Sequence, residues 1–433
     1  MLCENIGVNA AGHLTFAGQD TVELAHEYGT PLYLMDENRI REKCRVYMKA
    51  MKEAFGEESH PVYAGKAACF KYIYKIMKEE GMGIDLVSPG EIYTACSQGF
   101  PMENSYFHGN NKTDADIAYA MECGVGYFMV DNMYELKAIN DLAKEKGMIQ
   151  KVILRLTPGI DPHTYSAVAT GKVDSKFGIA IETGQAEEFV KKAVTFDNVQ
   201  IMGYHCHVGS QVFDEEGSVY LDAATIMLSF AAEMEKKYGL KMEILNMGGG
   251  YGVAYTQEDT GVDISANIRI LANHIKAECE KLGIGMPKVL MEPGRSIVAD
   301  AGMTLYSVGT LKEITGYKNY VSVDGGMTDN PRYALYGSKY TVYLAERMND
   351  PADFRCDVVG RCCESGDIIQ PDVLLPKPER GEVLAVATTG AYNYSMASNY
   401  NRIPRPALVM LKDSESFVAV KRETFEDLVK NDV

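Results

Sequence analysis

The sequence lacks an excess of basic residues. It contains 43 Lys and Arg against 60 Asp and Glu in 433 residues, which gives a formal net charge of −17. A chain that neutralises phosphate backbones, or that binds acidic membrane surfaces, needs the opposite balance. We therefore expect neither nucleic acid nor a membrane as a partner.

Long apolar runs and a targeting segment are also missing. The longest apolar stretches, such as residues 223–232, are much shorter than the roughly 18 residues that span a bilayer. Residues 1–16 contain no basic segment followed by an apolar one, which is the pattern of a secretory signal. We expect a cytoplasmic protein.

The ten cysteines form no C-x-x-C pair and no Cys/His cluster at zinc-binding spacing. The sequence therefore indicates neither a disulfide framework nor a metal site. Apolar residues make up 46% of the chain, and 40 Gly and 15 Pro are ordinary numbers for its length. This composition excludes a disordered or collagen-like chain and is typical of a folded one.

Between residues 60 and 295, short β-rich segments alternate with longer helical patterns, which is the rhythm of βα units. Eight such units in about 235 residues are typical of a (β/α)₈ barrel of the TIM type, where catalytic groups lie at the C-terminal ends of the strands. The expected strands are residues 61–65, 83–87, 105–109, 127–130, 152–156, 201–207, 243–247 and 288–292.

From about residue 303 the pattern changes to β-branched and aromatic segments without long helices between them. This change predicts a second, mostly antiparallel β domain, so the fold class is α/β with two domains. We expect residues 36–300 to form the barrel and residues 301–433 the β domain. Residues 1–35 are partly strand-like and are expected to join the β domain in part.

Lys66 comes directly after the first expected strand, in the segment YAGKA. In a barrel this position is at the mouth, where a lysine amine can act as a nucleophile that forms a Schiff base or as a phosphate counter-ion. A solvated lysine at the start of a helix is the simpler interpretation of this residue alone.

Three glycine-containing motifs, HVGS (207–210), MGGG (247–250) and EPGR (292–295), follow late strands. Glycine lets backbone N–H groups approach an anion, and Ser and Arg add donors. One such motif can be a simple turn, but three of them on late barrel strands favour a phosphate site.

Glu292 ends an apolar strand, where an ionised carboxylate needs a cationic or hydrogen-bonded partner. A salt bridge to Arg295 would satisfy it. The alternative is a protonated heterocyclic nitrogen, such as a pyridinium, that Glu292 keeps charged.

Two segments of the β domain, CCESGD (362–367) and GAYNYSMASNYN (390–401), are rich in Gly, Ser, Asn and Tyr, which is typical of exposed loops. A cysteine beside a glutamate could equally be a proton donor beside a carboxylate that binds a cationic group. The pattern alone leaves both interpretations open.

Taken together, YAGKA, HVGSQ, GGGYG, EPGR, NPRYALY, CESGD and GAYNYSMASNYN resemble the motif series of the diaminopimelate decarboxylases. These are pyridoxal-phosphate enzymes of the alanine racemase-like barrel group. The resemblance extends from about residue 30 to 405. The Lys and EPGR motifs also occur in ornithine and arginine decarboxylases of this fold, whereas CESGD and SNYN are more particular to the diaminopimelate branch.

The resemblance implies a role for each matching residue. Lys66 would bind the cofactor covalently, His207 would stack on its ring, and Glu292 would pair with the pyridine nitrogen. Arg332 and Tyr336 would bind substrate, together with Arg295 and Tyr392. The partner subunit of a homodimer would supply Cys363, as proton donor, and Glu364. The residues expected around the cofactor phosphate are Ser210, Gly250, Gly294, Arg295 and Tyr392.

The implied reaction is the decarboxylation of meso-2,6-diaminopimelate to L-lysine and CO₂, the last step of lysine biosynthesis. The far end of this substrate carries an ammonium and a carboxylate, which suit Glu364 and Arg332 respectively, because a buried unpaired Arg is costly. Residues 163–178 are expected to form a loop and helix that line this end.

Two positions depart from the family pattern. Ala68 stands where Asn is usual, and Asn246 stands where Asp is common. Neither replaces a group that we assign to the chemistry, but either could alter cofactor affinity or mark a divergent branch.

Other functions of the same barrel group are alternatives. The nearest is a decarboxylase that acts on D-ornithine, D-lysine or a carrier-bound amino acid. An amino acid racemase would have an Arg facing the pyridine nitrogen, so Glu292 argues against it. A pyridoxal-phosphate barrel without catalysis would lack the β domain that carries CESGD.

Overall fold

The computed structural model describes residues 1–160, 174–214 and 216–433. Contacts divide the chain into two units. The barrel unit comprises residues 43–252 and 261–294, and the β unit comprises residues 1–42, 253–260 and 295–433. The boundaries expected at residues 36 and 300 stay a prediction.

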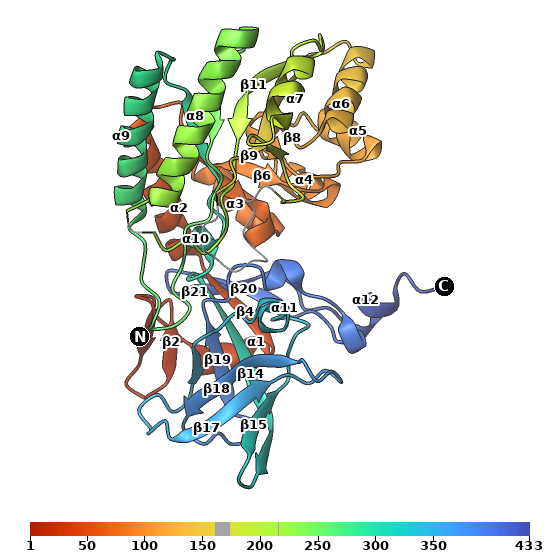
Figure 1. Ribbon diagram of the computed structural model, residues 1–433. Coiled ribbons are helices and arrows are strands. Elements are labelled where there is room, and N and C mark those ends of the chain that lie inside the picture. The colour runs from red at the N-terminus through yellow and green to blue at the C-terminus, as the bar shows by residue number, and fades with distance from the viewer. Residues whose placement is uncertain (161–173, 215) are drawn as a thin grey trace. The chain divides into compact units, whose positions relative to one another are not determined.

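The barrel unit contains eight parallel strands that close on themselves, because β8 pairs with both β7 and β9 (Figure 1). The short strand β10 (Ile179–Ala180) adds to β9 outside the ring. All eight strands expected from the sequence are present. Their bounds are β5 His60–Ala64, β6 Gly83–Leu86, β7 Ser105–Phe107, β8 Tyr127–Val130, β9 Gln150–Thr157, β11 Val199–His205, β12 Ile244–Asn246 and β13 Lys288–Met291.

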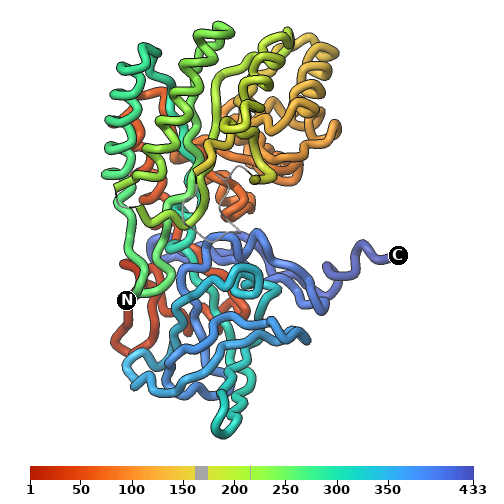
Figure 2. Tube along the Cα trace, viewed as in Figure 1, coloured from red at the N-terminus to blue at the C-terminus, as the bar shows by residue number. Residues whose placement is uncertain are grey.

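Helices surround these strands, and the chain trace in Figure 2 shows the alternation of strand and helix along the barrel unit. Serine at the N-cap and proline in the first turn begin α4, where Ser88 accepts a hydrogen bond from the Glu91 amide. The helices are α2 Glu37–Phe55, α3 Lys71–Glu79, α4 Pro89–Cys96, α5 Asp114–Glu122, α6 Met133–Glu145, α7 Gln185–Ala193, α8 Ser218–Tyr238 and α9 Ile264–Leu282, with 3₁₀ turns at Gly65–Ala67 and Met102–Asn104.

The inside of the barrel is filled by apolar side chains that alternate along the strands. One buried cluster contains a residue from each of seven neighbouring strands, so the barrel is a packed core and not a pore. Its buried members are Val62, Tyr106, Met129, Ile153, Met202, Ile244 and Leu290. This packing leaves the polar side chains at the strand ends.

The β unit contains a mostly antiparallel sheet in the order β18-β17-β15-β14-β4-β20-β21, with β19 pairing to β14 and β16. Strand β4 (Leu32–Asp36) lies between β14 and β20, so the N-terminal segment contributes a central strand. The other strands are β14 Gly302–Ile314, β15 Lys318–Val323, β16 Val342–Leu344, β17 Phe354–Val359, β18 Ile368–Leu375, β19 Val383–Ala387, β20 Ala407–Lys412 and β21 Glu415–Val420.

Smaller elements complete the β unit. Strands β1 (Ile6–Val8), β2 (Leu14–Phe16) and β3 (Gln19–Asp20) form a separate small sheet. Phe16 from this sheet packs with Leu34 and Met303 in a buried cluster. The remaining elements are α1 Thr21–Tyr28, α10 Arg295–Val298, α11 Arg332–Tyr336, α12 Phe425–Val429 and the 3₁₀ turns Tyr394–Met396 and Tyr400–Arg402.

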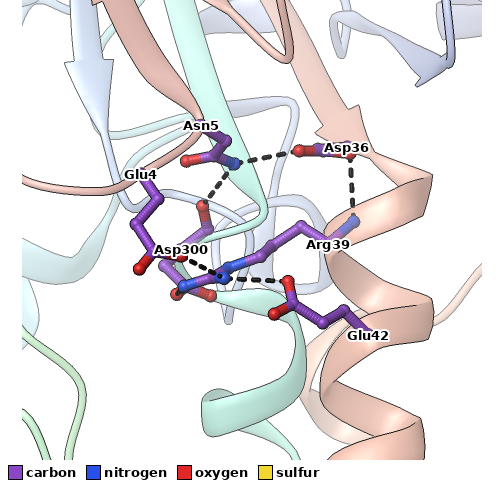
Figure 3. A network of polar contacts seen from close by, with 6 residues as sticks. All are labelled: Glu4, Asn5, Asp36, Arg39, Glu42 and Asp300. Carbon is purple, nitrogen blue, oxygen red and sulfur yellow. Dashed lines mark hydrogen bonds and ion pairs between the residues drawn. The ribbon is translucent and has the colours of Figure 1, made fainter.

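A polar network joins segments of the β unit that are far apart in sequence (Figure 3). Arg39 donates to Asp300 Oδ2 through Nη2 at 3.0 Å, and its Nη1 pairs with both Glu4 and Glu42. Asn5 donates to Asp36 at 3.1 Å and to the Asp300 carbonyl at 3.2 Å. The network ties the N-terminus to the end of β4 and to the loop before β14.

Within the described ranges, every helix is too short or too polar to span a membrane.

Candidate active site

Lys66 lies at the C-terminal end of the barrel, as the sequence predicts for the position after β5. It occupies a 3₁₀ turn (Gly65–Ala67), and it is exposed although the residues on either side of it are buried. The Ala64 amide donates to the Pro293 carbonyl at 3.0 Å, which joins this strand end to the EPGR segment. An exposed amine at a barrel mouth is accessible to a small carbonyl compound.

Glu292 follows β13 and is only 7% exposed. Its Oε1 accepts from Asn246 Nδ2 at 2.7 Å and lies 2.9 Å from His108 Nε2, while its Oε2 lies 3.2 Å from His205 Nε2. Burial alone would raise the pKa of Glu292, but the neighbouring His108 and the hydrogen bond from His205 outweigh it and hold the pKa well below its usual range. The barrel thus keeps a buried carboxylate ionised.

His205 is fully buried beside Glu292 and is neutral. Burial lowers its pKa to about 4, although the Glu292 charge acts in the opposite direction. A neutral imidazole can donate from one nitrogen only, so the contact with Glu292 places the proton on Nε2. His205 Nδ1 has no hydrogen-bond partner among the residues that the structure describes.

His207 lies two residues further on, at the end of β11. Its Nδ1 accepts a hydrogen bond from the Gly249 amide at 3.1 Å. Burial lowers the pKa of His207 well below its usual range, and the charges of Lys66 and Arg155 lower it further. His207 is therefore neutral with its proton on Nε2.

The glycine loop after β12 approaches its neighbours more closely than any side chain would allow. A Cβ on Gly249 would lie 2.0 Å from the Glu292 carbonyl, and a Cβ on Gly250 would lie 2.2 Å from the Gly209 carbonyl. Gly250 also has a φ of 118°, in the region that favours glycine. Glycine at these positions therefore lets the loop after β12 pack directly against the backbone that follows β11 and β13, with no side chain between them.

Two more of the residues expected at the phosphate, Ser210 and Gly294, lie at neighbouring strand ends. Ser210 follows β11 and is partly buried. Gly294 follows β13, and a Cβ there would lie 2.9 Å from that of Ala64. The barrel thus brings Ser210, Gly250 and Gly294 to the C-terminal ends of three strands that are neighbours in the sheet.

These features fit pyridoxal phosphate. A protonated pyridine nitrogen needs a buried carboxylate that stays ionised, which Glu292 is. A phosphate needs a backbone that it can approach without side chains in the way, which the glycines of this loop provide. An aldehyde needs an accessible amine, which Lys66 supplies.

A second cluster lies in the β unit and contains Arg295. Its guanidinium is buried, and Nη1 donates to the Tyr255 hydroxyl at 2.7 Å. Its Cζ lies 4.8 Å from the centroid of the Tyr392 ring. Tyr255, which follows the glycine motif, was not predicted from the sequence. Its carbonyl accepts a hydrogen bond from Thr341.

Arg332 belongs to the same cluster. It begins α11, is 6% exposed, and its Cζ lies 5.0 Å from the Tyr392 ring centroid and 5.1 Å from that of Tyr336. Its Nη2 makes a long hydrogen bond of 3.4 Å to Ser338, and its Nε has no partner in the described part of the chain. No carboxylate of the described residues pairs with this buried cation, so it can accept an anionic ligand.

Cys363 and Glu364 lie on a separate loop and are exposed. The Cys363 amide donates to Asn401 Oδ1 at 2.8 Å, and Glu364 accepts from the Gly366 amide at 3.3 Å. Within residues 1–160, 174–214 and 216–433, no polar or ring contact joins either side chain to Arg332 or Tyr392. The loop therefore presents both side chains outward.

Several polar residues of the barrel mouth were also not predicted from the sequence. These residues are buried, and they come from the ends of four strands that are far apart in the sequence. The sequence contained a signal for one of them. His205 lies two residues before His207, and residues two apart along a strand face the same side. The residues missed are Asp85, His108, Arg155 and His205.

Asn246 stands where Asp is common in the family, and it contacts Glu292 directly. Its amide can donate to the carboxylate, which an ionised Asp could not do. Most of the stretch at 163–178, expected to line the substrate, lies outside the described residues.

Comparison with known proteins identifies the family. The family described as "Pyridoxal-dependent decarboxylase, pyridoxal binding domain" matches residues 37–299. The diaminopimelate decarboxylase of Bacillus subtilis is 43% identical, covering 98% of this chain and 96% of its own. That of Staphylococcus aureus is 41% identical, covering 98% of each.

A solved structure agrees. The diaminopimelate decarboxylase of M. jannaschii, in a complex with L-lysine, is 34% identical and superposes with a TM-score of 0.91. The match covers 99% of this chain and 98% of that one. The chain therefore belongs to the diaminopimelate decarboxylase family of pyridoxal-dependent decarboxylases.

Proposed function

We propose how this chain carries out the reaction of its family, the decarboxylation of meso-2,6-diaminopimelate to L-lysine and CO₂. The chain is a carboxy-lyase that depends on pyridoxal phosphate. One observation carries the proposal about its substrate. Arg332 is a buried cation without a carboxylate partner among the described residues, and the substrate brings a second carboxylate.

Pyridoxal phosphate, when bound, withdraws the electron pair that loss of CO₂ leaves on the substrate carbon. Lys66 would hold this cofactor covalently through its amine. His207 would lie against its ring. The residues that bind the phosphate are Ser210, Gly250, Gly294, Arg295 and Tyr392.

Glu292 holds a proton on the ring nitrogen. Its pKa lies far below its usual range, so a proton shared between the two groups stays on the nitrogen. By keeping that nitrogen protonated, Glu292 would favour decarboxylation over racemisation. A racemase of this group would place an Arg at the nitrogen instead.

Arg332 binds the far carboxylate of the substrate, and Tyr336 packs on its guanidinium. Arg295 and Tyr392 complete this side. Glu364 binds the far ammonium. Ornithine and lysine carry only an ammonium at that end, so they would leave Arg332 buried and unpaired, at a cost in affinity.

Cys363 donates the proton that replaces CO₂ on the substrate carbon. A thiol can supply a proton and regain it near neutral pH. Because Cys363 and Glu364 are exposed on an outward loop, we place them in the active site of a partner subunit. The enzyme is then a homodimer with shared active sites, and it acts in the cytoplasm.

The first experiment is an absorbance spectrum of the purified protein, followed by an assay of CO₂ and lysine. The substrates are meso-diaminopimelate, D-lysine and D-ornithine. We expect a cofactor band in the visible range, its loss in Lys66→Ala, and lysine formed from diaminopimelate. Turnover of D-lysine or D-ornithine alone would contradict the substrate, and a protein that cannot be reconstituted with pyridoxal phosphate would contradict the site.

A further inference from the structure

The Glu292 carboxylate is held by a hydrogen bond at each of its oxygens. Asn246 donates to Oε1 at 2.7 Å from the end of β12, and His205 lies 3.2 Å from Oε2 at the end of β11. Both donors are buried, at 0% and 1% exposure. Two donors from different strands leave the carboxylate a single orientation.

The direction of each hydrogen bond is set by the surroundings. Asn246 Oδ1 accepts from the Gly248 amide at 2.9 Å, so its amide nitrogen must face Glu292. His205 is neutral because of its burial, so its contact with Glu292 uses the protonated Nε2. Both groups thus donate, and an acceptor in either place would repel the ionised carboxylate.

We propose that Asn246 and His205 are positioning residues, which hold the ionised Glu292 carboxylate in the orientation that meets the ring nitrogen of the cofactor. The proposal rests on the role assigned to Glu292 above. Neither residue needs to touch the substrate or the cofactor. They act by fixing a carboxylate before the cofactor arrives, so binding does not have to order it.

Other charged and titratable groups face Glu292 or lie in its field, and any change in its titration must be judged against them. His108 lies 2.9 Å from Oε1 and also 3.8 Å from Asp85 Oδ1, so it is placed between two buried carboxylates. The groups concerned, which come from four further strand ends and from the loop after β11, are Lys66, Asp85, His108, Arg155, Cys206 and His207. None of these is changed by the variants below.

The test uses the complete enzyme and two readouts other than turnover. The first is the acid pH midpoint of the absorbance change of the bound cofactor, which reports the protonation of Glu292. The second is the dissociation constant of pyridoxal phosphate from the reconstituted protein. Asn246→Asp keeps the shape of the side chain but removes the donor, and His205→Leu removes the other. We expect each to move the midpoint upward by about one pH unit or more and to weaken cofactor binding about tenfold.

Two further variants guard against a general loss of structure. His205→Gln retains an amide donor, and we expect it to restore much of the shift caused by His205→Leu. His60→Leu also removes a histidine from the barrel, where burial keeps the pKa at about 4, but it contacts Tyr106 and not Glu292. We expect no shift of the midpoint in this control.

Glu292→Gln separates this proposal from the proposed function. If this variant leaves the spectrum and its pH dependence unchanged, the assigned role of Glu292 is wrong. If it changes them while Asn246→Asp and His205→Leu behave like the parent, the role stands and the positioning proposal is overturned. In the Glu292→Gln background we expect the two variants to add no further shift.

Discussion

The guanidinium carbon of Arg332 lies 5.0 Å from the centroid of the Tyr392 ring, and that of Arg295 lies 4.8 Å from the same ring. One aromatic ring thus contacts two buried cations. Because water does not separate these cations, their mutual repulsion is weakly screened, and the ring offsets part of it. An aromatic ring attracts a nearby cation through its negatively charged faces. Tyr392 is therefore central to the electrostatics of the cluster that contains Arg295 and Arg332.

Substitution of Tyr392 tests this arrangement. Tyr392→Leu removes the ring, and a desolvated cation–π contact is worth roughly 2 kcal/mol, so we expect kcat/KM for meso-diaminopimelate to fall about 30-fold. Tyr392→Phe keeps the ring and loses only the hydroxyl, so it should weaken cofactor binding more than substrate binding. Equal kinetics in the Phe and Leu variants would refute the role of the ring.

Arg332→Leu tests the far-carboxylate site. Loss of one partner of a buried ion pair costs about 2–5 kcal/mol, so kcat/KM for meso-diaminopimelate should fall by roughly 30- to 1,000-fold or more. Any residual activity on D-lysine, which lacks the far carboxylate, should change much less. Arg355 is exposed and pairs with Asp372 on the surface, so Arg355→Leu is the matched control and should behave like the parent.

Mixing two inactive variants tests whether the active site is shared. Lys66→Ala and Cys363→Ala each remove one group from every site of a homodimer. In a mixed dimer with shared sites, one site carries both changes and the other carries neither. After the two proteins are unfolded and refolded together, about a quarter of the parent's activity should return. No recovery, despite mixed dimers shown by mass spectrometry, would place Cys363 in the site of its own subunit.

Asp329 makes the stability of the β unit depend on pH. Burial raises its pKa to about 7, although hydrogen bonds from Tyr306 and the Gly326 amide oppose this. The folded state then holds a proton that the unfolded chain loses near pH 4. Between about pH 4 and 7 the folded state binds more protons, so the free energy of unfolding falls as the pH rises and levels off above about 7.

Asp329→Asn removes this titration. We expect the free energy of unfolding of the variant to fall less between about pH 5 and 8, by up to roughly 3 kcal/mol relative to the parent. Urea unfolding at the two pH values measures the difference. If the parent and the variant lose the same stability over this interval, Asp329 does not titrate there.

Lys112 and Glu135 form an ion pair inside the barrel unit, with side chains 1% and 3% exposed. Lys112 Nζ donates to Glu135 at 2.7 Å and to the carbonyls of Gly109 and Met129. Lys112→Met would leave Glu135 buried without a cation, so it should cost about 3–5 kcal/mol in the free energy of unfolding. Adding Glu135→Gln should recover part of the loss, and no recovery would show that the carboxylate charge is not the cause.

The sequence by itself determined the elements and their order. Alternation of apolar strands with helical patterns predicted all eight barrel strands. These features depend on neighbours in the chain, because backbone preferences, capping and the hydrophobic period are local. Placement of Lys66 and Glu292 at strand ends followed from the same patterns.

Tertiary structure alone decided which side chains meet at the site. Asn246, His108 and His205 reach Glu292 from three other strand ends or the loops after them, because the closed sheet brings these ends together. It also decided that Arg332 is buried without a carboxylate partner in the described part of the chain. Burial and partners depend on packing between segments far apart in sequence, so a pattern along the chain does not contain them.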